Sequence, residues 1–439
     1  MSNLGGIHTK KLKITPGRLI TLGFAALILI GTVLLMLPIS HSDGASVSLV
    51  DAMFTATSAV CVTGLVAFDT GATFSVFGRT VIATLIQIGG LGITTFGLGL
   101  MLFMRRKASI KDMVLAKESF NHSTMNGVMG LIKTVFLATA LFELLGALLC
   151  LPVFISKYSP LEAVGYSLFH SIAAFNNAGF DIFGMGDSMY AYIDHAYLNI
   201  VTMALIMLGG LGFFVMSDIL TKKKPRKYSL HTKVVLVSTI VLTVGGALLF
   251  KLSEGDGISW LSAFFTSVST RTAGFATRPM AEFSNAGIMI MNILMIIGAS
   301  PGSTGGGIKT TTAFVLLRHL FAYSTNSEPV AFKRRIPEEA VKKALAILML
   351  AVCSVMLCTT AICTLEPSLP LKDVIFEVCS GFGTAGLSTG ITGELCDMSK
   401  LVLMATMFVG RLGPLTIATL WISKANTGIS RAEESIQIG

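Results

Sequence analysis

Four glycines occupy matching places in a pattern that repeats along the chain: Gly64, Gly179, Gly274 and Gly386. Each ends a short apolar stretch with a phenylalanine ten residues earlier, and a threonine or alanine comes just before the glycine. Glycine permits backbone dihedrals that other residues resist, so four such segments could point their carbonyl oxygens toward one axis. Rings of carbonyl oxygens replace the hydration shell of an alkali cation. The repeat therefore predicts a cation-conducting pathway; the alternative is that these glycines only serve close helix packing in a membrane.

The predicted ion-coordinating segments are the few residues that lead up to each glycine. They comprise Val60, Cys61, Val62, Thr63 and Gly64; Asn176, Asn177, Ala178 and Gly179; Arg271, Thr272, Ala273 and Gly274; and Gly383, Thr384, Ala385 and Gly386. The backbone carbonyls expected to bind the ion belong to Val62, Thr63, Asn177, Ala178, Thr272, Ala273, Thr384 and Ala385. The polar side chains of His170, Glu377, Asn176 and Asn177 are not shared by the four copies. We therefore expect them to brace the segments by hydrogen bonding rather than to coordinate the ion.

A run of small residues interrupts one long apolar segment between Gly298 and Gly307. Proline lacks a backbone donor and glycine has low helix propensity, so this run should break the helix. Non-helical backbone at membrane depth is tolerated only where it is buried in protein or lines a water-filled cavity. The run resembles a nucleotide-binding P-loop, but Ile308 stands where that pattern needs lysine. Lys309 is expected to extend toward the cytoplasmic interface.

Arg411 lies in another apolar segment, within the sequence FVGRLGP. A charge inside a membrane segment is costly and should face the protein interior or water. From the residues alone, the guanidinium could donate hydrogen bonds to the carbonyls of the interrupted segment. A second, compatible interpretation comes from the family resemblance given below.

These features require membrane helices to position them, and the composition provides for such helices. The chain has 53% hydrophobic and 13% charged residues and a mean hydropathy of +0.76, whereas soluble chains carry about 25% charged residues. Residues 19–38 contain no ionisable side chain and could cross a ~30 Å hydrocarbon core. The sequence predicts an all-α integral membrane protein with eight spanning segments in four pairs: 19–38 and 80–103, 131–155 and 196–220, 234–250 and 285–320, 342–364 and 400–423.

The basic residues predict the orientation. Most Lys and Arg residues fall between the pairs of segments and at the two ends of the chain. By the positive-inside rule both termini are cytoplasmic, and the short glycine-containing stretches enter the membrane from outside. The net charge of +9 is thus read as topology and not as a sign of a nucleic-acid partner.

The four glycine motifs, VCVTGL, NNAGF, TRTAGF and GTAGLS, resemble the filter loops of the Trk/Ktr/HKT superfamily of potassium transporters. The resemblance covers residues 16 to 425 and is greatest to the KtrB-type membrane subunits of bacterial Ktr systems. It implies a pseudo-fourfold central pore built from four repeats of outer helix, pore helix, filter and inner helix, and intact filter glycines that favour potassium. It also implies an intramembrane gate at Gly302, Ser303, Thr304, Gly305, Gly306 and Gly307, with Arg411 projecting beneath the filter as an electrostatic barrier.

The expected division is a cytoplasmic N-terminus at 1–18, repeats at 19–104, 130–220, 234–322 and 341–424, and a cytoplasmic C-terminus at 425–439. The resemblance further implies a homodimer in the lipid of the cell membrane and a cytosolic ring of nucleotide-binding regulatory subunits of the RCK type. No enzyme activity and no covalent cofactor are expected; K⁺ is the transported ion and Na⁺ an optional activator. The alternative function is potassium/sodium symport by alternating access, although four same-direction repeats favour a fixed pore.

Overall fold

The structure is a computed structural model that describes residues 15–104, 128–183, 188–222 and 224–420. Most of the expected N-terminal segment 1–18 and all of the C-terminal segment 425–439 lie outside the described residues, as does Lys223. Helices dominate the described part of the chain, and its only strands are β1 (Val330–Ala331) and β2 (Arg334–Arg335), which pair antiparallel.

Four long helices bear apolar side chains that are largely exposed. These are α1 (Pro16–Leu35), α7 (Val128–Phe154), α11 (Leu230–Glu254) and α15 (Glu338–Leu365). On α1, for example, Leu29 is 60% exposed and Val33 is 64% exposed. Among the residues searched, these four helices are long and apolar enough to cross a membrane, and the number rises to six if each of two bent helix pairs forms one span. The expected eight spans are therefore not reached by helix length and composition alone.

A short helix and a second helix follow each long helix. The short helices are α2 (Leu49–Cys61), α8 (Pro160–Phe175), α12 (Trp260–Ser269) and α16 (Leu371–Gly383). The second helices are α4 (Val76–Leu91), α9 (Ala196–Leu211), α13 (Asn285–Ile296) and α17 (Asp397–Leu412). Serine side chains cap several of these helices: Ser48 accepts from the backbone N–H of Asp51, and Ser259 accepts from that of Ser262. We call each set of long, short and second helix a unit and number the units along the chain.

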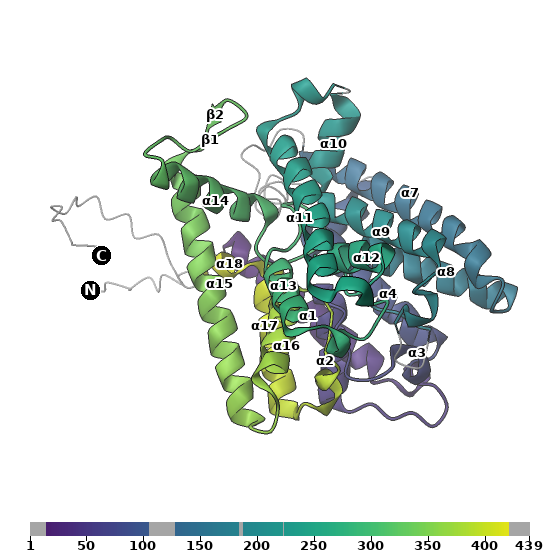
Figure 1. The fold of residues 1–439 in the computed structure, drawn as a ribbon. Helices are drawn as coiled ribbons and strands as arrows, with labels where there is room; N and C mark the ends of the chain where they lie inside the picture. The colour runs from purple at the N-terminus through teal and green to yellow at the C-terminus, as the bar shows by residue number, and fades with distance from the viewer. Residues whose placement is uncertain (1–14, 105–127, 184–187, 223, 421–439) are drawn as a thin grey trace, which may run out of the picture.

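Contacts between helices close the units into a ring; the long helices α15 and α7 lie on opposite sides of the view in Figure 1. The second helix of each unit packs against the short helix of the next unit: α4 against α8, α9 against α12, and α13 against α16. The contact of α17 with α2 closes the ring between the last unit and the first. An ion pair strengthens this closing contact, because the Lys400 ammonium lies 2.7 Å from the Asp51 carboxylate across it.

The second helices are not continuous, contrary to the expectation from their apolar length. In units 1, 2 and 4 the helix ends at Gly92, Gly212 or Gly413, whose φ values are +82°, +90° and +88°. The chain then resumes in α5 (Ile93–Phe103), α10 (Phe213–Thr221) or α18 (Pro414–Thr419). The bend is 96° between α4 and α5 and 92° between α9 and α10. Glycine allows these breaks because its backbone accepts positive φ without a Cβ clash.

Unit 3 differs, since a loop separates α13 from α14 (Thr310–Ser324), as the run of small residues predicts. The loop is held at its base by a pair of backbone hydrogen bonds, from Gly298 N–H to the Ile308 carbonyl (2.9 Å) and from Ile308 N–H to the Ile296 carbonyl (3.1 Å). The remaining short elements are α3 (Thr70–Thr73) and six 3₁₀ turns at Pro38–Ser40, Tyr190–Tyr192, Pro225–Lys227, Gly255–Gly257, Met280–Glu282 and Ile391–Glu394.

Candidate functional site

The four repeated glycines lie next to one another in ring order. A Cβ placed on Gly64 would lie 2.9 Å from the Cα of Gly179, and one placed on Gly179 would lie 2.8 Å from the Cα of Gly274. The corresponding distances are 3.2 Å from Gly274 to Gly386 and 3.0 Å from Gly386 back to Gly64. All four have positive φ, between +66° and +89°. The structure thus brings the four predicted segments together at one place, with no room for a side chain at any of the four glycines.

The residue two places before each glycine is also left-handed, which the sequence analysis did not foresee. Val62, Asn177, Thr272 and Thr384 have φ between +50° and +72°. Residues with a branched Cβ rarely adopt this conformation, and each costs of order 1–3 kcal/mol of strain. The same two positive-φ positions recur in all four units. We call residues 60–64, 176–179, 271–274 and 383–386 the glycine segments; their side chains are buried, and Arg271 is the most exposed of them at 8%.

The loop of unit 3 lies directly against the glycine segments. The Gly306 N–H donates to the hydroxyl of Thr384 (2.9 Å), and the hydroxyl of Thr304 bonds to the side-chain amide of Asn177 (3.1 Å). A Cβ on Gly305 would collide with the Thr272 hydroxyl. The loop therefore contacts three of the four left-handed residues, one from each of units 2, 3 and 4.

Backbone bonds fix the loop to α10 of unit 2 and to α17 of unit 4. Phe213 N–H donates to the Gly302 carbonyl (2.9 Å), and Gly307 N–H donates to the Gly410 carbonyl (3.2 Å). Gly302 and Ser303 are half-buried, while Thr304, Gly305, Gly306 and Gly307 are buried. The loop is thus enclosed by protein, as non-helical backbone in a membrane must be.

Arg411 and Lys309 together bind three consecutive carbonyls of this loop. The Arg411 guanidinium donates to the carbonyls of Thr304, Gly89 and Gly90. The Lys309 ammonium donates to the carbonyls of Gly305 (2.7 Å) and Gly306 (3.4 Å). The expectation that Lys309 extends toward the cytoplasmic interface is therefore wrong, because its ammonium turns back to satisfy loop carbonyls. For Arg411, the interpretation as a hydrogen-bond donor to the interrupted segment is confirmed.

Arg411 also fills the first unit's corner beneath the ring. By position in the repeat it matches Gly90 and Gly210, which are small. Its bonds to Gly89 and Gly90 place the guanidinium at unit 1, where the loop makes no contact with the left-handed Val62 comparable to its contacts with the other three. The loop contacts the ring at units 2, 3 and 4 and the guanidinium lies at unit 1, and both Arg411 and Lys309 bind carbonyls of the loop.

Glu377 and the two asparagines form the hydrogen bonds expected of side chains that brace the glycine segments, whereas the His170 ring bonds to α9 instead. Both carboxylate oxygens of buried Glu377 accept bonds from the chain that follows Gly386, from Ser388, Thr389 and Thr392. The His170 ring bonds to the hydroxyl of Thr202 (2.9 Å). The Arg271 side chain extends toward the outer helix α11, where its guanidinium donates to the Thr239 carbonyl and the Thr243 hydroxyl, both at 3.3 Å.

One acidic residue in contact with a glycine segment was missed in the sequence. Glu143 lies in the middle of α7 and binds Asn176 and Gln87 through both carboxylate oxygens. A signal was present, because an ionisable residue within an apolar span marks a functional or structural site.

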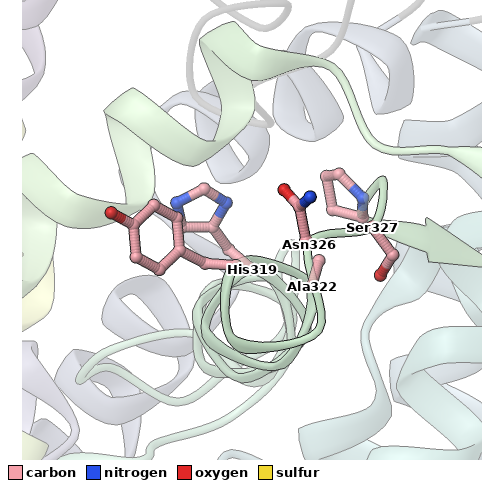
Figure 2. A pocket seen from close by; sticks show the side chains of 6 residues that line it. His319, Ala322, Asn326 and Ser327 are labelled. Carbon is pink, nitrogen blue, oxygen red and sulfur yellow. The ribbon is translucent and has the colours of Figure 1, made fainter.

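A separate pocket lies away from these segments, at the end of α14. Figure 2 shows His319, Ala322, Asn326 and Ser327 at its wall, together with Tyr323 and Pro329. None of these residues belongs to the glycine segments or to the loop. The described residues contain no group of three or more His, Cys, Asp or Glu side chains that could hold a metal ion.

Comparison with known proteins gives consistent results. The sequence profile of a family described as TrkH, cation transport protein, matches residues 19–251 and 230–429. The Ktr system potassium uptake protein B of Bacillus subtilis is 38% identical over 418 residues, which cover 93% of this chain and 93% of that protein. The potassium/sodium uptake protein NtpJ of Enterococcus hirae is 37% identical over 443 residues, which cover 97% of this chain and 98% of that protein. The crystal structure of the potassium transporter TrkH from Vibrio parahaemolyticus has the same fold, with a TM-score of 0.74 at 18% identity over 95% of this chain and 87% of that one.

Proposed function

The chain belongs to the TrkH family of cation transport proteins, and from this premise we propose that it carries potassium ions across the cell membrane through a fixed central pore. The observation that carries the proposal is the ring of four glycines, each touching the next. In this proposal the glycine segments are the selectivity filter, and the carbonyls of residues 62–63, 177–178, 272–273 and 384–385 bind K⁺. One relative named for potassium uptake and one named for potassium/sodium uptake, each more than a third identical over nearly the full chain, support potassium as a transported ion.

The proposed architecture has four repeats, at 19–104, 130–220, 234–322 and 341–424, with eight crossings of the membrane in total. The long helices α1, α7, α11 and α15 are the outer helices, and the short helices lead from the outer face to the filter. Each second helix, together with the segment after its break, completes a crossing. Both termini are then cytoplasmic, as the distribution of basic residues favours.

Gly302–Gly307, with Arg411, is the proposed gate. Its backbone lies against three filter segments, and the nearby Arg411 and Lys309 cations oppose the passage of K⁺. Such a plug blocks conduction in place and must be displaced for ions to pass. The Arg411 and Lys309 side chains donate hydrogen bonds to loop carbonyls that would otherwise lack donors, and these bonds stabilise the closed conformation of the gate.

A second candidate function is coupled potassium/sodium transport. The relative named for potassium/sodium uptake is as similar to this chain as the relative named for potassium uptake alone. Among the described residues, no group of three or more His, Cys, Asp or Glu side chains marks a separate cation site, so sodium enters the proposal as an optional activator or a second transported ion.

The test is uptake of potassium, or of rubidium as its tracer, into proteoliposomes that contain the purified chain, with and without an inward sodium gradient. Selective uptake that runs down a potassium gradient without sodium supports the pore. Uptake that requires sodium in a fixed ratio supports the symporter. Absence of potassium uptake by correctly folded protein, with sodium present or absent, rejects both.

A further inference from the structure

Glu143 is a carboxylate in the middle of an apolar helix, α7, with Leu141, Leu144 and Leu145 exposed around it. Both of its oxygens are occupied. Oε1 accepts from the side-chain amide of Asn176 (2.8 Å), and Oε2 accepts from that of Gln87 (3.2 Å). No Lys or Arg side chain pairs with it in the described part of the chain. A carboxylate within a membrane segment costs free energy, and its hydrogen bonds to Asn176 and Gln87 offset part of that cost.

The network holds Asn176 from two sides. Its Nδ2 donates to Glu143 and also lies 2.9 Å from Oε1 of Gln87 and 3.0 Å from the Ile172 carbonyl. Asn176 is fully buried and directly precedes the left-handed Asn177, three residues before Gly179. A Cβ on Gly90 would collide with the Asn176 side chain, so α4 of unit 1 packs tightly against it. One carboxylate on the outer helix of unit 2 thereby joins the glycine segment of that unit to the second helix of unit 1.

We propose that Glu143 is a positioning residue for potassium selectivity: it holds Asn176, and through it the second filter segment, in register with the first unit. The inference rests on the proposed function. The chemistry explains why a carboxylate is needed, since only a carboxylate can accept from Asn176 and Gln87 at once. Glutamine at 143 would offer one acceptor and one donor, and would leave two amide N–H groups facing each other whichever way Gln87 is turned.

The experiment compares Glu143→Gln with the swapped double variant Glu143→Gln/Gln87→Glu. In the swap the carboxylate sits on α4, accepts from the new amide at 143 and still accepts from Asn176, so every bond of the network is restored. Both variants are measured as purified, folded protein for uptake of potassium in competition with sodium. We expect Glu143→Gln to lower the potassium-to-sodium uptake ratio about tenfold, the effect of one buried donor left without a partner, and the swap to recover most of the ratio.

Thr139→Val is the matched control, because Thr139 is a buried α7 residue one turn from Glu143 whose hydroxyl has no partner. It should leave the ratio unchanged. If wild-type protein takes up no potassium, the proposed function fails, whatever the variants do. If the wild type is selective and folded Glu143→Gln is equally selective, or the folded swap stays as poor as the single variant, the inference about Glu143 is overturned.

A Glu143→Gln protein that does not fold would move the test to Gln87→Met. This variant removes both Gln87 bonds and keeps the bond between Glu143 and Asn176. A reduced ratio in folded Gln87→Met supports the network as a selectivity determinant, and an unchanged ratio refutes it.

Discussion

At the scale of single residues, the geometry of the four glycines is set by contact and by backbone conformation together. A side chain at Gly64 would collide with the segment of Gly179, and the residue carrying it would also have to adopt a φ of +89°. The left-handed residues two places earlier do carry side chains, and two of these side chains, Asn177 and Thr384, form hydrogen bonds with the loop of unit 3. Strain at these positions is thus offset by hydrogen bonds that also fix the loop.

Gly64→Ser should lower the preference for potassium over sodium, because the added side chain must displace the segment of Gly179. The strain expected at one such position is about 1–3 kcal/mol, so a loss of about tenfold in selectivity is the expected scale. Competitive uptake of the two ions into proteoliposomes measures it. Gly245→Ser is the control, since a Cβ there has nothing within 4 Å. Unchanged selectivity of Gly64→Ser would place this glycine outside the filter.

Arg411→Ala should raise potassium flux about tenfold, because each 1.36 kcal/mol removed from a barrier is a tenfold gain in rate. It should also lower the melting temperature, since the carbonyls of Thr304, Gly89 and Gly90 lose their donor. Arg411→Lys separates the two roles. Wild-type flux in Arg411→Lys points to charge as the barrier, whereas flux as high as in Arg411→Ala points to the hydrogen bonds that hold the loop. No rise in flux in either variant would contradict both.

The repeat in the sequence predicts which glycines come together, but it does not predict the backbone conformation of the residues near them. Glycine is visible as a residue type, so its repeat can be found without a structure. Val62, Thr272 and Thr384 are residues that avoid positive φ, and nothing in their type announces a left-handed conformation. The predicted direction of the Lys309 side chain was wrong. The rule that lysine extends to the membrane surface takes no account of loop carbonyls three and four residues earlier in the chain that need a donor.

At the scale of elements, the loop between α13 and α14 and the three glycine breaks are variants of one design. In units 1, 2 and 4 the second helix ends two residues after Gly89, Gly209 or Gly410. In unit 3, α13 ends two residues before the matching Gly298, and a longer loop follows before α14 begins. The break is predictable there from Pro301 and the run of glycines. It was not predicted at Gly92 or Gly212, because a single glycine in an apolar run is equally compatible with a continuous membrane helix.

Deletion of residues within Gly302–Gly307 should raise potassium flux severalfold, because the covering of the glycine segments is shortened. Uptake into proteoliposomes, normalised to the amount of folded protein, checks this. Normal or reduced flux in a folded deletion variant would argue against a gate.

Gly212→Ala should disturb the loop, and Gly92→Ala should not. Both glycines have nearly the same backbone conformation, so both substitutions cost of order 1–3 kcal/mol of backbone strain. A Cβ on Gly212 would in addition lie 2.7 Å from the Pro301 carbonyl, while one on Gly92 meets nothing closer than 4.0 Å. We expect similar losses of thermal stability in the two variants but a raised flux in Gly212→Ala only. Equal flux in the two would show that the loop is not coupled to the α9–α10 break.

At the scale of the whole molecule, the described residues form one ring of four units. A basic hairpin made of β1, β2 and the turn between them follows the C-terminal end of α14 (Figure 1). Lys333 stands in the turn of the hairpin, and Arg334 and Arg335 form β2. One of these charges is partly used within the chain, since Arg335 pairs with Glu328 at 3.3 Å. The pocket at His319 and Tyr323 lies in the same region. We propose that a cytosolic nucleotide-binding subunit docks on this hairpin, on the basic loop at 222–227 and on the C-terminal half of the third inner helix. The alternative is that the basic residues only set topology and bind anionic lipid.

Purification from the native membrane in mild detergent should yield a dimer of this chain with a nucleotide-binding subunit attached. Reversal of charge at Lys333, Arg334 and Arg335 together should weaken that association about tenfold or more, because several favourable contacts become repulsive. Quantitative pull-down measures the effect, with Lys372→Glu as a control at an exposed lysine outside the hairpin. A chain that purifies alone as a monomer, with full regulated uptake, would refute both the partner and the dimer.

The ring of four units in one polypeptide has a consequence for how the protein can evolve. In a channel assembled from four copies of one gene product, every codon change appears at all four corners at once. Here a codon change alters one corner and leaves three as they were. The position three residues before the glycine already differs in every unit, with Cys61, Asn176, Arg271 and Gly383. Under the proposed function, natural selection can therefore adjust ion preference one unit at a time, while the other three glycine segments stay unchanged.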